Sequence, residues 1–297
     1  MKTINIKDQN LLKNSWIFIK SVLILLISTV SVIAQPTQPA ASFILIDVKV
    51  FNGLGDVIEN GAVGVKDGKI DYVGTTAKAP LSNYREVISK KDTHLYPGFI
   101  ALNTTLGLTE IDAVRATRDF SETGDLNPNV RAISAYNAES EIVQTVLANG
   151  ILFAQITPRG GTIKGSSSVV KLKGHNWEDA AYRTDEGIVM KWPTMYKPKD
   201  KKDDRQGFTT DKKYEQELEA ITSFFKSAHA YSQKQIPVER DLRFEAMRGV
   251  FDGSKRLYIS ADFIKEIREI ISFKRKYDIP KVSIIGGYDS WMAADLL

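Results

Sequence analysis

The chain of 297 residues is 43% hydrophobic and 26% charged, an ordinary composition for one large globular domain or two smaller ones. It contains no cysteine, which excludes disulfides, cysteine-bound zinc and thiol catalysis. The formal charge of +4 belongs largely to residues 1–34, because the rest of the chain has 36 basic against 35 acidic side chains, and it therefore gives no argument for a nucleic-acid partner.

Residues 1–34 have the pattern of a secretory signal peptide. Basic residues end at Lys20, and an apolar run follows that is shorter than the ~20 residues needed to span a bilayer. We expect cleavage near Ala34, a periplasmic or secreted mature chain, and no stable membrane span after cleavage. An uncleaved anchor that includes residues 16–19 is the alternative.

Residues 43–96 have the pattern of a small antiparallel β-sheet. Short apolar runs are separated by turn signals at Asn52–Gly53, Asn60–Gly61 and Asp67–Gly68. The last of these suits a tight hairpin, because such a turn needs positive φ.

From Pro97 onward, apolar strands alternate with helical stretches. Strands are expected at residues 99–102, 151–156, 167–172, 257–260 and 282–285. Helices are expected at residues 130–149, 213–233 and 262–277 and after Asp289, with polar loops at 107–129 and 197–213. This alternation predicts an α/β fold of parallel βα units. A complete (β/α)₈ TIM-type barrel takes eight strands and about 250 residues, so the prediction is a partial, truncated barrel.

Two groups of residues after these strands are candidate contacts for a ligand. Five charged side chains follow the first strand and are expected on the face where the strands end: Glu110, Asp112, Arg115, Arg118 and Asp119. They would bind a cation or a carboxylate group, or they form a charged surface with internal ion pairs. Residues 160–168 are rich in glycine and serine, and they form either a nest of backbone N–H groups for an anion or a turn shaped by glycine.

The order of motifs resembles imidazolonepropionase-like amidohydrolases. The resemblance rests on residues 47–74 followed by Tyr96-Pro97-Gly98-Phe99-Ile100, and residues 103–111, 157–161, 176–180 and 284–289 are similar to an exported Bacteroidetes-type branch. It implies an incomplete composite β-sandwich domain over residues 43–96, then the N-terminal part of a metal-dependent barrel over 97–297. Members hydrolyse non-peptide carbon–nitrogen bonds with a metal, typically zinc, that lowers the pKa of a bound water.

The residues at the family's metal positions are poor ligands here. Asn103 and Thr105 stand where the resemblance implies a His-x-His pair, Ser260 where it implies the histidine of strand five, and Gly286 or Gly287 near that of strand six. We therefore expect no metal cofactor and no hydrolysis by this chain, and no catalytic residue is identified. The alternatives are an exported, non-catalytic relative that binds a small molecule, and a truncated gene product.

Histidines and partners add little to this interpretation. The chain has three histidines, His94, His175 and His229, which are far apart in the sequence and are not expected to bind a metal. A small-molecule substrate or ligand is the expected partner, and the oligomeric state is left open.

Overall fold

The computed structural model describes residues 42–198, 207–234 and 239–297. Contacts divide the chain into two units, one ending at Pro97 and the other beginning at Gly98. The predicted signal peptide lies outside the described residues. Within the described ranges, no helix is both long and apolar enough to cross a bilayer.

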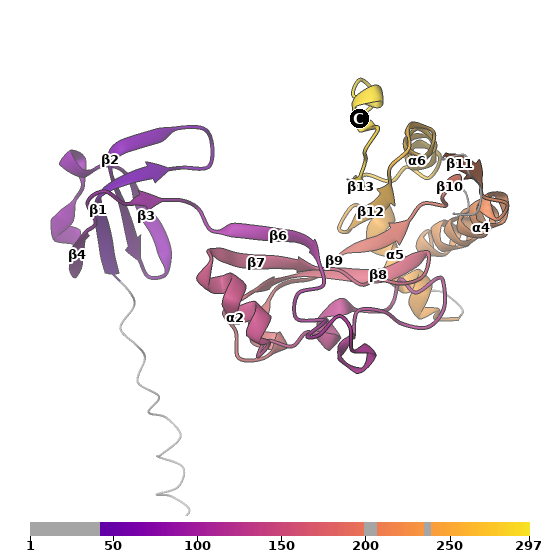
Figure 1. Ribbon diagram of the computed structural model, residues 1–297, viewed down its shortest axis with the longest axis horizontal. Helices are drawn as coiled ribbons and strands as arrows, with labels where there is room; N and C mark the ends of the chain where they lie inside the picture. Colours follow the sequence, from indigo (N-terminus) through magenta and orange to yellow (C-terminus); the bar gives the residue numbers. More distant parts are fainter. Residues whose placement is uncertain (1–41, 199–206, 235–238) are drawn as a thin grey trace, which may run out of the picture. The chain divides into compact units, whose positions relative to one another are not determined.

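The first unit is a five-stranded sheet (Figure 1). Its strands are β1 (Ser42–Phe51), β2 (Val57–Lys66), β3 (Lys69–Thr75), β4 (Glu86–Ser89) and β5 (His94–Leu95). The first three are antiparallel neighbours, as predicted, whereas β4 and β5 pair with β1 in parallel. The described residues of this unit form a single sheet, and the second sheet of the sandwich that the resemblance implies is not among them.

The second unit is built on a curled, six-stranded mixed sheet, called here the larger sheet (Figure 1). Its strands, from one edge to the other, are β13 (Val282–Gly286), β12 (Arg256–Ala261), β9 (Ala181–Lys191), β8 (Ile163–Lys171), β7 (Ile151–Ile156) and β6 (Phe99–Thr104). Five of them run in one direction, and β8 runs antiparallel to both of its neighbours.

The prediction of parallel βα units is therefore wrong for residues 167–172. The chain turns back after β7 at Gly160 and Gly161, both with positive φ, and enters β8 without an intervening helix. Such a direct return can only give an antiparallel neighbour, because a parallel connection needs a crossover of a dozen or more residues. Strand β9, which was not predicted from the sequence, pairs with β8 on one side and with β12 on the other.

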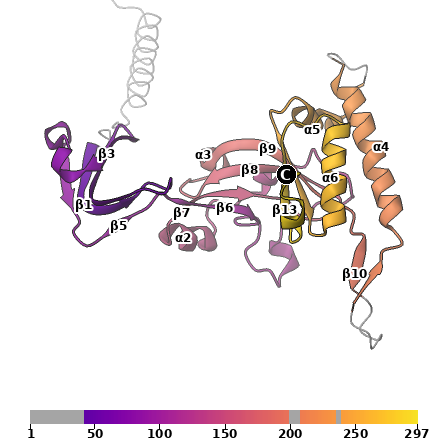
Figure 2. The same ribbon diagram turned by 90° about the horizontal axis from the view of Figure 1, so that it is seen from above.

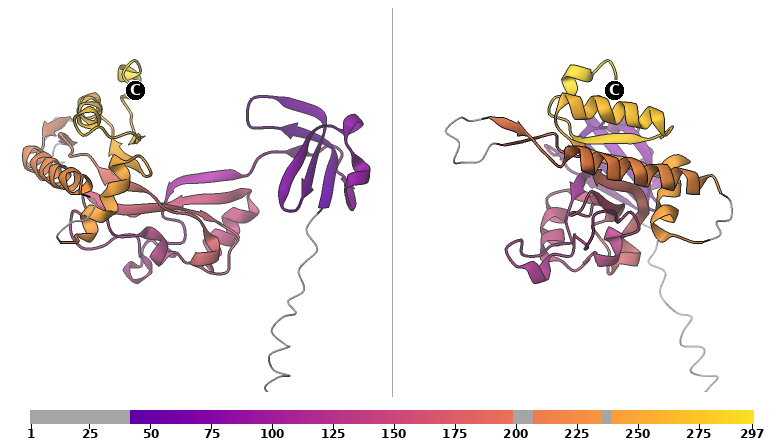
Figure 3. Two further views of the ribbon diagram at one scale, coloured as in Figure 1. Left: turned by 180° about the vertical axis from the view of Figure 1, so that it is seen from behind. Right: turned by 90° about the vertical axis from the view of Figure 1, so that its right-hand side faces the viewer.

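One face of the larger sheet is covered by two hydrophobic cores. Strands β9 and β12 pack against α4 (Tyr214–Ser232), α5 (Leu242–Phe251) and α6 (Ile264–Lys276), while β7 and β8 pack against α2 (Glu141–Ala148) and the segment before it. Helices α4 and α6 lie side by side (Figures 2 and 3), with the rings of Phe225 and Phe273 4.8 Å apart. The alternation of apolar residues along these strands places every second side chain in this core.

The helix predicted over residues 130–149 is broken into two shorter pieces. A 3₁₀ turn covers Ala132–Ala135, and α2 begins only at Glu141. Between them, the N–H of Asn137 donates to the carbonyl of Gly107, and the side chain of Asn137 accepts from the N–H of Glu139. These bonds close a turn that a continuous helix would not allow.

The other helical predictions fare better. α4 and α6 match the stretches predicted at 213–233 and 262–277, and a 3₁₀ turn at Ser290–Ala293 lies where a terminal helix was expected. Helix α5 was not predicted. The stretch expected as a polar loop contains a short hairpin of β10 (Tyr196–Pro198) and β11 (Phe208–Thr210), with residues 199–206 outside the described ranges. The remaining short helices are Thr76–Lys78, Leu81–Asn83, Arg115–Thr117 and α3 (Trp177–Ala180).

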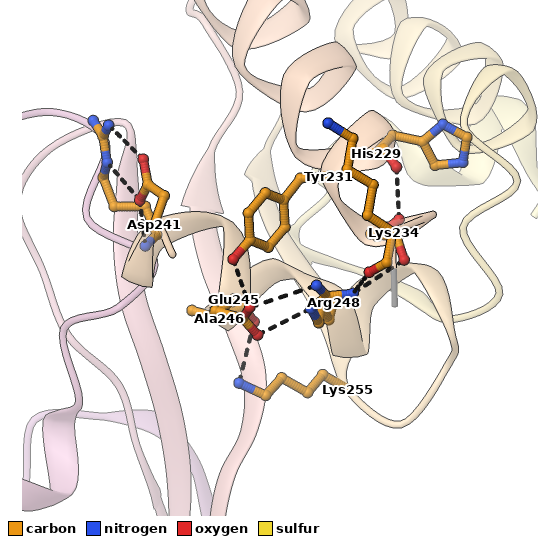
Figure 4. Close-up of polar contacts among 10 residues, drawn as sticks. His229, Tyr231, Lys234, Asp241, Glu245, Ala246, Arg248 and Lys255 are labelled. Carbon is orange, nitrogen blue, oxygen red and sulfur yellow. Dashed lines mark hydrogen bonds and ion pairs between the residues drawn. The ribbon is translucent and has the colours of Figure 1, made fainter. Parts of the chain in front are cut away.

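Arg248 of α5 holds the end of α4 (Figure 4). Its guanidinium donates to the carbonyls of Ser232 and Lys234, pairs with Glu245 at 2.9 Å, and lies over the ring of Tyr231. The hydroxyl of Tyr231 donates to the same glutamate. Carbonyls at a helix C-terminus lack intrahelical partners and favour cations, so this cluster stabilises the α4–α5 junction.

Candidate functional site

The face of the larger sheet opposite its helices carries a hydrogen-bonded polar network, defined here as Gln155, Ser167, Glu186 and Tyr258. One carboxylate oxygen of Glu186 accepts from the amide of Gln155 and the hydroxyl of Ser167, each at 2.7 Å. The other accepts from the hydroxyl of Tyr258 at 3.0 Å. These residues come from four adjacent strands, and the network therefore crosses most of the sheet.

Glu186 reaches this face because β9 contains a β-bulge. Ser167 is opposite Gly187 while Val169 is opposite Arg183, so three residues of β9, Thr184 to Glu186, lie opposite the single residue Ser168 of β8. Within the bulge, Asp185 has a φ of 49°. A bulge re-aims the side chains beside it. Without it, Glu186 would share the helix-covered face with Ile188, two positions further on.

Burial makes this network sensitive to charge. Glu186 is 9% exposed, Gln155 5% and Ser167 0%. Burial, followed by the charge of Glu186 and the hydrogen bond to it, raises the pKa of Tyr258 to about 12. The tyrosine therefore stays protonated and remains a donor, and the three neutral donors satisfy a buried carboxylate that has no ion pair among the described residues.

Asn103 links this network to the edge where the parallel strands end. It lies near the end of β6, at a register shift against β7, with a φ of 51° that asparagine tolerates better than most residues. Its N–H donates to the side-chain carbonyl of Gln155. Its side-chain oxygen accepts from Arg159 at 2.8 Å and from Thr157 at 3.0 Å, and its backbone carbonyl accepts a second guanidinium nitrogen of Arg159 at 2.7 Å.

The other two predicted metal-position residues lie at the same edge. Thr105 directly follows β6 and is partly buried. Ser260, in β12, pairs with Lys191 of β9 and Ile285 of β13. The strands thus bring Asn103, Thr105 and Ser260 to one edge of the sheet, as barrel topology predicts.

The side chains at this edge do not fit a catalytic zinc ion. The amide oxygen of Asn103 is engaged by a guanidinium, and a positive group at 2.8 Å repels a second cation at the same atom. Catalytic zinc takes about three nitrogen, sulfur or carboxylate ligands. Among the described residues, no three His, Asp or Glu side chains gather to supply them.

The histidines lie elsewhere. His94 belongs to the first unit, His175 is exposed after β8, and His229 packs against the rings of Phe251 and Tyr277. None of them contacts Asn103 or Ser260 among the described hydrogen bonds.

The five charged candidates all belong to the loop that follows β6. Both carboxylate oxygens of Glu110 accept hydrogen bonds, from Asn137 and from Ser140. Asp112 and Arg115 are exposed, and Arg118 pairs with Thr109 across a turn. In the described part of the chain, none of the five bonds to Asn103 or Ser260.

Asp119 differs from the other four in that it lines a pocket, together with Phe120, Arg131 and Pro158. Whether the five residues contact a ligand stays a prediction.

Sequence reasoning missed the residues that organise this face. Glu186 and Tyr258 are single polar residues inside strands, and the bulge that places Glu186 has no clear sequence signature. Arg159 was visible as the cation directly after a buried strand in Thr157-Pro158-Arg159, a position that the parallel arrangement assigns to the ligand-binding edge.

Comparison with known proteins bears on the fold. No protein-family model matches the chain, and no curated protein sequence does. Among solved structures, an amidohydrolase from Thermotoga maritima MSB8 is similar with a TM-score of 0.70 and 20% sequence identity, over 86% of this chain and 67% of that one. A. niger ochratoxinase matches over 26% of this chain and 18% of its own, at 21% identity and a TM-score of 0.23, too low to carry an argument.

The Thermotoga maritima similarity confirms an amidohydrolase-like fold for the chain. At 20% identity it says nothing of the reaction, which has to be argued from the residues at the edge of the sheet.

Proposed function

We propose that this protein binds a small molecule at the carboxyl edge of the larger sheet and does not catalyse metal-dependent hydrolysis there. The observation that carries this proposal is the bidentate contact of Arg159 with Asn103, at the position of the family's first metal ligand. A guanidinium is always charged and cannot ligate a metal, so it takes the space and the charge that a divalent ion would have.

The fold supports the binding part of this proposal. In barrels of parallel strands, ligands are bound at the carboxyl ends of the strands. The edge of this sheet presents polar and cationic side chains there, from Asn103, Arg159 and Ser260, on a rigid hydrogen-bonded support.

Hydrolysis of a non-peptide carbon–nitrogen bond is the second candidate function. The fold shared with the Thermotoga maritima amidohydrolase favours it. This candidate needs a water activated by some group other than the residues at the family's ligand positions, because Asn103, Thr105 and Ser260 offer no strong metal ligand.

A turnover assay with and without a chelator separates the two candidates. The full chain would be incubated with cyclic amides and N-acyl amino acids, with zinc or with EDTA. We expect no turnover in either condition. Turnover that EDTA abolishes and zinc restores would overturn the proposal in favour of a metal-dependent hydrolase.

Export is a separate part of the proposal and rests on the pattern of residues 1–34. Expression in a bacterial host followed by mass spectrometry of the periplasmic fraction tests it. A mature N-terminus at Gln35 is expected, and a chain that keeps Met1 in the cytoplasm would contradict it.

A further inference from the structure

We propose that Arg159, Lys164 and Lys191 form a binding site for the oxyanion group, a carboxylate or a phosphate, of a small ligand. This inference rests on the proposed function, since it names the chemical class of ligand that the same edge takes. The three cations come from the ends of three adjacent parts of the sheet: the turn after β7, the start of β8 and the end of β9.

Arg159 is held in place before any ligand arrives. Two of its guanidinium nitrogens donate to the side-chain and backbone oxygens of Asn103. Its backbone N–H donates to the carbonyl of Phe120. A guanidinium has five N–H donors, so donors remain for a second, planar partner. A preorganised guanidinium loses little entropy on binding, and carboxylate and phosphate groups match its geometry.

Lys191 lies on the same face as Ser260. The two residues are register partners in β9 and β12, and the N–H of Lys191 donates to the carbonyl of Thr162. Met190, the residue before it, points into the helix-covered core, so Lys191 points to the opposite face. A cation therefore lies beside two of the positions at which the resemblance implies a metal ligand. Arg159 bonds to Asn103, and Lys191 is the register partner of Ser260.

Lys164 completes the group at a second irregularity of the sheet. Ile163 is opposite Met190 and Gly165 is opposite Val189, so Lys164 is the extra residue of a bulge beside the end of β9. Its side chain is partly buried. The register with Met190 and the bond from the N–H of Lys191 to the carbonyl of Thr162 place Lys164 beside the end of β9. Burial, then the charges of Arg159 and Lys191, lower the pKa of Lys164.

The nearby carboxylates do not neutralise these cations. Within the described ranges, none of the three cations forms an ion pair with a carboxylate. Glu122 and Asp125 lie on the neighbouring loop, and Glu122 bonds to Thr123. Three like charges held together without a counterion are unfavourable, and an anion bound among them would relieve that repulsion.

Side chains rather than backbone groups make this site. A nest of N–H groups in the glycine-rich turn was one reading of residues 160–168, but the N–H groups of Thr162 and Ile163 both donate to the carbonyl of Asp125. The anion would therefore be bound by the three cations, with Asn103 and Ser260 beside it.

Titration of the full chain with inorganic phosphate and, separately, with acetate tests the inference. Binding is followed by the ³¹P and ¹³C line widths at constant ionic strength, set with chloride. We expect saturable binding of one anion per chain. Lys164→Met and Lys191→Gln should each weaken it by about tenfold or more, and Lys171→Met, the same loss of charge at the other end of β8, by less than about twofold.

The outcomes separate this inference from the proposed function. Binding that is not saturable, or equal in Lys164→Met, Lys191→Gln and Lys171→Met, would mean an adventitious ion only and would overturn the inference. Lys191 is exposed, so its variant serves if Lys164→Met does not fold. Anion binding that EDTA abolishes would instead contradict the metal-independent function proposed above.

Discussion

Asn103 is the residue at which the family resemblance and the chemistry of this chain diverge. Its backbone N–H donates to Gln155, its side-chain oxygen accepts from Thr157 and Arg159, and its φ of 51° fits an asparagine. The resemblance implies a histidine at this position, and the asparagine found here has hydrogen-bond partners for its backbone and for its side chain.

Asn103→Asp should weaken anion binding by about tenfold, because a carboxylate placed 2.8 Å from Arg159 neutralises that cation with almost no change in size. Asn176→Asp is the matched control. It adds the same charge at the start of α3, where the side chain of Asn176 accepts from Asp179 and aspartate caps equally well. Phosphate titration compares them, and equal losses in both variants would count against a role for Arg159.

The pKa of Lys164 determines how stability and anion binding should depend on pH. Its folded pKa lies below the ordinary 10.5, so the folded state holds this proton less tightly than the unfolded chain. Stability should therefore rise with pH between the lowered pKa and about 10.5. Anion affinity should fall over the same range, since the neutral amine no longer attracts the ligand.

Two groups face Lys164 and favour its neutral form, Arg159 and Lys191. NMR of ¹³C-methylated lysines would measure its pKa. A pKa of Lys164 at or above the ordinary 10.5 would contradict the placement of the three cations.

Replacing Glu186 should lower the stability of the folded chain. Glu186→Leu should cost several kcal/mol, because it leaves Gln155 and Tyr258 without this acceptor, at about 1–3 kcal/mol for each buried group, and leaves the hydroxyl of Ser167 only the carbonyl of Gly187, at 3.3 Å. Glu186→Gln keeps an acceptor and should cost clearly less. Urea unfolding gives both values, and a neutral Glu186→Leu would show that the network is solvated.

The same variant should shift the titration of Tyr258. Its pKa of about 12 lies above the ordinary 10, so its contribution to stability is present below pH 10 and is lost as the pH rises towards 12. Glu186→Gln removes the charge beside Tyr258 and should lower the pKa of this tyrosine. Absorbance titration of Glu186→Gln, compared with that of Tyr258→Phe, would measure the change.

At the scale of elements, strongly periodic segments were predictable and irregular ones were not. Helices α4 and α6 were found from their apolar stripes, and β6, β7, β12 and β13 from short apolar runs. Strand β9 was missed because it begins with a run of consecutive polar residues, Arg183 to Glu186, and holds its bulge there. The direction of β8 depends on how tightly residues 157–162 turn, which a propensity pattern does not specify.

Arg248, at the junction of α4 and α5, should contribute to the stability of the folded chain. Arg248→Met should destabilise the chain by about 1–3 kcal/mol, since it removes the donor to two carbonyls at the end of α4 and leaves Glu245 without its cation. Arg243→Met removes an exposed arginine whose partner, Asp241, is two residues away, and should cost less than about 1 kcal/mol. Urea unfolding compares the two, and equal costs would contradict the capping role of Arg248.

At the scale of the whole molecule, the sequence predicted the fold class better than the site. The motif order around Pro97 pointed to an amidohydrolase-like barrel, and the similarity to the Thermotoga maritima structure confirms that fold in its coarse form. The edge that collects Asn103, Thr105 and Ser260 followed from barrel topology. The cations that meet there did not, because Arg159 and Lys164 come beside Lys191 only through a tight turn and a bulge.

We propose that cationic side chains take the place of a metal at the carboxyl edge of the larger sheet. The most direct test of this proposal is the metal content of the full chain after dialysis against micromolar zinc, measured by mass spectrometry for the wild type, Asn103→Ala and Ser260→Ala. We expect much less than one zinc per chain at this site, and a zinc content that neither substitution changes. One zinc per chain that is lost on replacing Asn103 or Ser260 would contradict the proposal.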